Sequence, residues 1–188
     1  MDQNTVFLVV LAVAVIAVAI VAWALVRKMR TKKLQGKFGP EYQRTVQQVG
    51  DRGKAEDELE ARRKRVEKFT LRPLSAQEQT RFAREWAATQ GRFVDDPKGA
   101  VADGNRLVKE LMQARGYPVA DFDARYESLT VDHTAVAQHY RAGHDIALSA
   151  LEGKATTEEL RQAMIHYEAL FGDLAEEEAP PQVAEHAS

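Results

Sequence analysis

Hydrophobic positions are distributed unevenly along this chain, and the longest apolar run lies close to its start. Residues 6–26 read VFLVVLAVAVIAVAIVAWALV, with no charged residue, no Gly and no Pro. At about 1.5 Å per residue, a helix of this length spans roughly 30 Å, the thickness of the hydrocarbon core of a bilayer. The run therefore predicts a transmembrane helix, preceded by a short extracytoplasmic segment at residues 1–5.

A cleaved signal peptide and a buried soluble helix are the two alternatives to a membrane anchor. A signal peptide has a basic start, a shorter apolar run and a small-x-small cleavage site. This chain starts MDQNT, and its apolar run leads directly into RKMRTKK. A helix that is apolar all round is also unusual at the extreme end of a small soluble protein. The pattern therefore favours a single-pass signal-anchor.

Basic residues flank the apolar run on its C-terminal side only. None precedes the run, and six Lys and Arg side chains follow it: Arg27, Lys28, Arg30, Lys32, Lys33 and Lys37. The positive-inside rule therefore predicts an N-terminus outside and a long C-terminal part in the cytoplasm. Trp23 suits the aromatic belt at the inner membrane interface.

The sign of the net charge changes along the rest of the chain. Residues 27–72 carry 15 Lys and Arg against 7 Asp and Glu, whereas residues 73–188 carry 11 against 20. The basic part adjoins the bilayer, where anionic lipid headgroups attract it by about 1 kcal/mol per residue close to the surface. No nucleic acid is expected as a partner, because the basic residues adjoin the apolar run and lack interleaved aromatic residues.

Turn signals divide the chain after the basic cluster. Gly36 and the Gly39-Pro40 pair predict a break, and residues 41–69 then predict one charged helix. Its apolar positions are too few for it to be enclosed on all sides. We interpret residues 27–72 as a basic juxtamembrane segment and a helical stalk. Pairing of the stalk as a coiled coil, which would make the protein a homo-oligomer, is the alternative.

Residues 73–175 show helical periodicity and no strand-like alternation, which predicts a small cytoplasmic helical bundle. Capping boxes are predicted at Ser75 with Glu78 and at Thr156 with Glu159. Further cap signals are Asp95 or Asp96 before Pro97, Asp132 before a helix from residue 134, and Gly116 at a helix end. The acidic, proline-containing segment 176–188 predicts a disordered tail. The fold class expected for the whole chain is all-α.

Histidine is the residue type that offers catalytic or metal chemistry, because the chain contains no cysteine. The five histidines are His133, His139, His144, His166 and His186. They form no H-E-x-x-H motif, and both His144 and His166 fall on or beside apolar helix faces, where a hydrogen-bonded core histidine is the commoner situation. We predict no catalytic, metal or cofactor-binding residue and no cofactor. A metal or enzymatic site built from His133, His144 and His166 is the weaker alternative.

Two stretches of the chain carry a resemblance to a known family. They are RFVDDPKGAVADGNRLVKELMQARGYPVADFDARYESLTVDHTAVAQHYRAGHDI and TTEELRQAMIHYEALF. The chain resembles, over roughly residues 36–174, an uncharacterised family of bacterial, mostly actinobacterial, single-pass membrane proteins. The resemblance implies a bacterial plasma membrane, and it implies no activity and no site residue.

The sequence leads to three hypotheses of function. The first is a membrane-anchored helical adaptor that holds its cytoplasmic domain near the bilayer and binds a protein partner. The second is a structural membrane protein that self-associates through the stalk. The third, and weakest, is a histidine-based metal protein or enzyme.

Overall fold

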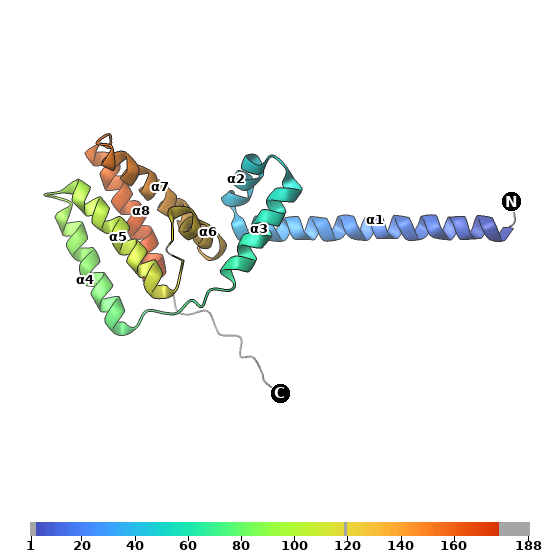
Figure 1. Ribbon diagram of the computed structural model, residues 1–188, viewed down its shortest axis with the longest axis horizontal. Helices are drawn as coiled ribbons and strands as arrows, with labels where there is room; N and C mark the ends of the chain where they lie inside the picture. Colours follow the sequence, from blue (N-terminus) through green and yellow to red (C-terminus); the bar gives the residue numbers. More distant parts are fainter. Residues whose placement is uncertain (1–2, 119, 177–188) are drawn as a thin grey trace, which may run out of the picture. The chain divides into compact units, whose positions relative to one another are not determined.

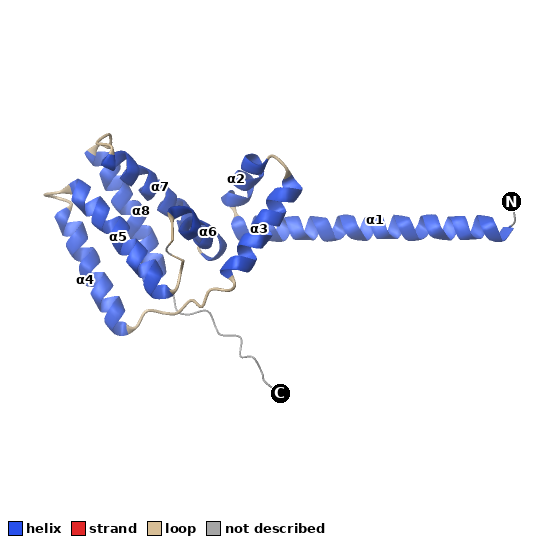
Figure 2. Cartoon of the chain, in the orientation of Figure 1, coloured by secondary structure: helices blue, strands red, loops and turns tan. Residues whose placement is uncertain are grey.

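The fold is all-α, which confirms the predicted fold class. A computed structural model describes residues 3–118 and 120–176, and this part of the chain forms helices and connecting loops without a strand (Figures 1 and 2). Its helices are α1 (Gln3–Phe38), α2 (Pro40–Val49), α3 (Arg52–Val66), α4 (Ala76–Arg92), α5 (Pro97–Arg115), α6 (Phe122–Asp132), α7 (Thr134–Leu151) and α8 (Thr157–Glu176). The predicted acidic tail beyond Glu176, with His186, lies outside the described residues.

The chain divides into two compact units, Met1–Glu60 and Ala61–Ser188. The division falls inside α3, whereas the sequence analysis starts the bundle at residue 73. We call the first the anchor unit and the second the bundle unit, and each is described by itself.

The N-terminal part of α1 has the length and composition of a membrane span. Within Leu11–Phe38, an 18-residue window is apolar enough to cross a membrane. Its large apolar side chains from Leu11 to Val26 are each more than half exposed. The structure therefore confirms one apolar N-terminal helix of spanning length.

The C-terminal end of α1 is partly buried, and the predicted break at Gly36 is wrong. The helix continues through Gly36 to Phe38, and the chain turns at Gly39, whose φ of 50° is left-handed. Leu34 and Phe38 lie on one buried face of α1. Burial of two such side chains stabilises the helix by several kcal/mol, which outweighs the roughly 1 kcal/mol that a helical Gly costs.

The predicted single helix over residues 41–69 is also wrong, because two helices occupy this stretch. Gly50 ends α2 with a left-handed φ of 72°, and α3 starts at Arg52. Tyr42 and Leu59, two of the few apolar residues of the predicted stalk, are buried. A single chain therefore already covers part of the apolar stripe that a coiled coil would need.

Local cap signals in the bundle unit are mostly confirmed. Ser75 and Glu78 form a reciprocal capping box at the start of α4, and Thr156 with Glu159 does the same before α8. The Asp96 side chain accepts from the Gly99 N–H at 2.9 Å, and Gly116 ends α5 with a φ of 95°.

The predicted Asp132 cap is wrong. Asp132 is the last residue of α6, and His133 lies between α6 and α7 without a side-chain capping hydrogen bond to α7. The His133 backbone N–H donates to the Leu129 carbonyl at 2.7 Å, which continues the α6 pattern past Asp132.

The bundle unit is built around α8, which packs against both α5 and α7. Tyr167 of α8 is fully buried, with its ring next to Gly104 of α5 and Gly143 of α7. Trp86 of α4 stacks on Phe171 of α8 with ring centroids 4.9 Å apart. Helices α4, α5, α7 and α8 lie alongside one another in Figure 1, and their facing side chains form one hydrophobic core.

Candidate functional sites

The six predicted membrane-flanking basic residues all lie on α1, directly after the exposed apolar stretch. Five of them, from Arg27 to Lys33, are exposed, and Lys37 is half-buried. Arg27 lies over the Trp23 ring at 5.3 Å from its centroid, and Arg30 donates to Asp57 at 2.7 Å. A guanidinium over an indole at the end of an apolar span is chemistry suited to a membrane interface.

A buried carboxylate joins the three helices of the anchor unit. Glu56 of α3 is 2 % exposed and accepts hydrogen bonds from Thr31 of α1 at 2.7 Å and from Tyr42 of α2 at 2.8 Å. Arg52 donates to the same oxygen at 3.2 Å. Burial by itself raises the pKa of Glu56, but the three hydrogen bonds outweigh it and hold that pKa below its ordinary value. Glu56 is therefore an ionised structural link between α1, α2 and α3.

His133 lies in a three-residue relay that the sequence analysis missed. Its Nε2 is 2.6 Å from the Tyr117 hydroxyl, and its Nδ1 bonds to the Asp173 carboxylate. This order of carboxylate, imidazole and hydroxyl is that of a nucleophile activated by a general base. However, Tyr117 is only 3 % exposed, and none of the three residues lines a cavity described below. The relay therefore fits a structural link between α8, the α6–α7 corner and the segment after α5.

His139 and His166 also meet, across the α7–α8 interface. Their Nδ1 atoms are 2.9 Å apart, and the ring centroids are separated by 5.2 Å. Within the described residues, no group of three or more His, Asp or Glu side chains converges to hold a metal ion. The structure thus pairs His166 with His139, and not with His133 and His144 as the metal hypothesis requires.

His144 differs from the hydrogen-bonded core histidine that the sequence analysis favours. It is half-buried and stacks on Phe122 with ring centroids 3.9 Å apart. Its buried Nδ1 has no hydrogen-bond partner among the described residues. Burial lowers the pKa of His144, since a charged imidazole loses hydration when it leaves water.

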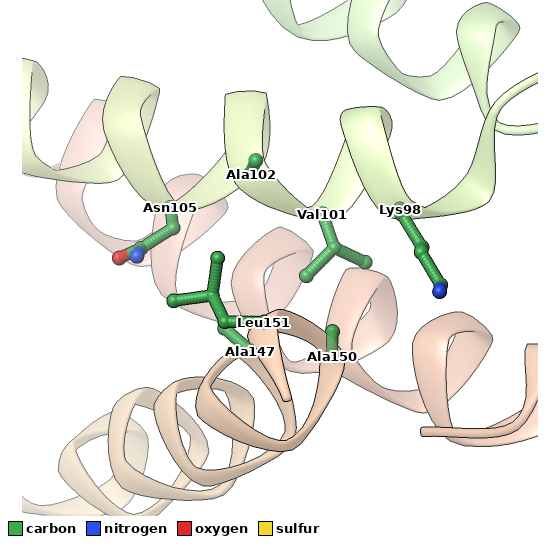
Figure 3. Close-up of a pocket in the computed structure, with 7 residues that line it drawn as sticks. All are labelled: Lys98, Val101, Ala102, Asn105, Ala147, Ala150 and Leu151. Atoms are coloured by element: carbon green, nitrogen blue, oxygen red, sulfur yellow. The ribbon is translucent and has the colours of Figure 1, made fainter. Parts of the chain in front are cut away.

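A small cavity lies between α5 and α7. It has a volume of about 140 Å³ and is lined by Lys98, Val101, Ala102, Asn105, Ala147, Ala150 and Leu151. Figure 3 shows Leu151 reaching from α7 toward α5, between Asn105 and Val101. Pockets for small ligands hold roughly 300–1,000 Å³, so this space is too small for an ordinary cofactor.

A second cavity in the bundle unit is likewise small. Its volume is about 160 Å³, and it borders Glu127, to which both Arg62 and Arg65 form ion pairs.

A larger open groove runs between α4 and α8, and we call it the α4–α8 groove. Its volume is about 580 Å³, and it is lined by Gln79, Ala83, Trp86, Glu168, Phe171, Gly172 and Ala175. Small residues leave the space open, and the stacked Trp86 and Phe171 rings lie along it. Aromatic side chains that line an open groove are typical anchors of protein interfaces, so this groove is the candidate site for a protein partner.

Comparison with known proteins identifies no relative. No protein family, no curated protein and no solved structure matches this chain. The resemblance to the actinobacterial family therefore stays a prediction, and function has to be argued from the chain itself.

Proposed function

We propose that this protein is a membrane-anchored adaptor that binds a protein partner through the α4–α8 groove of its helical bundle. The observation that supports it best is that one chain contains both an exposed apolar helix of spanning length and a separate bundle unit with an open groove. A partner of suitable chemistry is an amphipathic helix, because its apolar face can contact Trp86 and Phe171 where Gly172 leaves room.

The proposal includes a cellular location and an orientation in the membrane. A bacterial plasma membrane, an N-terminus outside and a cytoplasmic bundle follow from the resemblance and from the basic flank of α1. Exposed Lys and Arg side chains beside the span also suit contact with anionic headgroups.

Neutralising the basic flank tests the orientation. Replacing Arg27, Lys28, Arg30, Lys32 and Lys33 with Gln is expected to give a mixed topology, because the positive charge that retains the C-terminal side in the cytoplasm is lost. The measurement is labelling of a Gly91→Cys reporter by a membrane-impermeant maleimide in intact cells. A reporter that stays fully protected in the neutralised protein would show that another feature sets the orientation.

Filling the groove tests the binding site. Gly172→Trp places a large ring in the α4–α8 groove, and a Cβ at Gly172 meets no atom within 4 Å, so the fold should tolerate it. The matched control is Gly91→Trp, because a Cβ there also meets nothing and Gly91 does not line the groove.

The readout is crosslinking of the full chain in its own membrane. We expect a specific protein to be captured by the parent and by Gly91→Trp, and its yield to fall at least about tenfold with Gly172→Trp, because the new ring blocks the partner's contact with Trp86 and Phe171. Equal capture by all three proteins would rule out the groove, and no captured partner would count against the adaptor itself.

Neither alternative gains support from a specific observation. Self-association through the stalk needs an open apolar stripe, and Tyr42 and Leu59 of that stripe are buried. A histidine-based metal site or enzyme needs His133, His144 and His166 to converge, and they lie in three separate arrangements.

A further inference from the structure

The contact between His139 and His166 depends on its protonation state. The two Nδ1 atoms are 2.9 Å apart, and a straight N–H···N hydrogen bond requires one nitrogen to donate and the other to accept. The neutral pair satisfies this with one ring protonated at Nδ1 and the other at Nε2. When both imidazoles are cationic, both Nδ1 atoms carry protons, so the hydrogen bond is lost and two like charges face each other.

The pair lies at the interface between α7 and α8. Each ring is half-buried, one on α7 and one on α8. These two helices also meet through Tyr167, whose ring lies beside Gly143. Burial, and after it the charge of His139, lower the pKa of His166. A repulsion here therefore acts directly on the α7–α8 contact.

Other ionisable groups on the packed elements have different partners. From α5, the Arg115 guanidinium donates to the Leu174 carbonyl, and the charge of Lys109 bears on His144. From α6, Arg125 donates to Tyr140. Further charged groups on α7 and α8 are Asp145, whose charge bears on Tyr167, Asp173, which bonds to His133, and Glu159, which bonds to Thr156. Within the described residues, His139 is the charged group that bears on His166.

We propose that His139 and His166 form a proton-sensitive contact that holds α7 against α8 at neutral pH and weakens when both imidazoles are protonated. The sign follows from linkage. In the unfolded chain both histidines titrate near pH 6.5, whereas the folded pair resists the second proton. The stabilisation is complete above about pH 6.5 and is lost as the pH falls below it.

The test measures unfolding of the full chain in lipid nanodiscs, with EDTA present, at pH 7.5 and pH 5.5. The chain has two Trp residues, so a Trp23→Phe background leaves buried Trp86 as a fluorescent reporter of the bundle unit. Acidification is expected to raise the unfolding equilibrium constant about tenfold more in this parent than in His139→Gln or His166→Gln, because one imidazole of the folded pair stays neutral at pH 5.5 while its unfolded counterpart is protonated. Gln keeps a neutral hydrogen-bonding group at the contact.

His144→Gln is the matched control, because His144 is also half-buried with a lowered pKa but has no histidine partner. The His144→Gln variant should keep the part of the pH dependence of unfolding that comes from His139 and His166. Equal pH dependence in the parent and in both pair variants would overturn the proposal. If a variant does not fold, the test is a pH titration of the imidazole proton resonances in the unsubstituted chain, followed by NMR. At least one of the pair must titrate below the ordinary histidine value, and titration of both at that value would refute the contact.

Discussion

Substitution of Gly143 should strongly destabilise the bundle unit. A Cβ at this position would stand 2.9 Å from Cε1 of Tyr167, closer than real Cβ contacts allow. The Tyr167 ring cannot move away freely, because Gly104 of α5 approaches its Cδ2 edge. We expect Gly143→Ala to lower the free energy of unfolding by about 1 kcal/mol after its gain in helix propensity, and Gly143→Leu by about 3 kcal/mol.

The matched control for Gly143 is Gly172→Ala in α8. A Cβ there meets no atom within 4 Å, so the helix gains propensity without a clash, and stability should rise by up to about 1 kcal/mol. Urea unfolding followed by Trp86 fluorescence in the Trp23→Phe background measures both variants. If Gly143→Ala were as stable as Gly172→Ala, the close packing of α7 on Tyr167 would be wrong.

Removal of the Glu56 carboxylate should destabilise the anchor unit by a free energy of similar size. Glu56→Ala leaves the Thr31 and Tyr42 hydroxyls buried without their acceptor, and we expect a loss of about 2–3 kcal/mol in local stability. Amide hydrogen exchange of α2 and α3 in the full chain reports it. Because the pKa of Glu56 is held low, its contribution is complete above about pH 4.3 and is lost only as the pH falls through the lowered folded value.

Asp57→Ala provides the control for the neighbouring position. Asp57 also forms an ion pair with α1, through Arg30, but its side chain is 71 % exposed. Exposed pairs contribute little, so exchange in α2 and α3 should stay close to that of the parent. Exchange that accelerates equally in both variants would indicate that general loss of negative charge, and not the buried network, destabilises the unit.

Features that depend on a few neighbouring residues were predictable from the sequence. The Ser75–Glu78 capping box, the Asp96 cap and the Gly116 helix end each depend on groups within one helical turn, and all three are present. The failure at Gly36 involves competition with burial. Gly36 signals a break, but the buried faces at Leu34 and Phe38 carry the helix through it.

The contacts of the candidate sites depend on long-range packing, which single-sequence patterns do not contain. His133 and Asp173 are 40 residues apart, and His139 and His166 are 27 apart. Helical spacing placed His166 at the margin of an apolar face but gave no information on which residue of α7 it would meet. Glu56 carries no sequence signal either, because a Glu in a charged helix is ordinarily exposed.

Topology mapping tests the central claim, that an apolar anchor holds a cytoplasmic bundle at the membrane. The chain contains no cysteine, so single reporters can be introduced without background. The measurement compares Thr5→Cys and Gly91→Cys in intact cells treated with a membrane-impermeant maleimide. We predict membrane-bound protein in which Thr5→Cys is labelled and Gly91→Cys is labelled only after lysis. Labelling of Gly91→Cys in intact cells, or recovery of the uncleaved protein in the soluble fraction, would contradict the account.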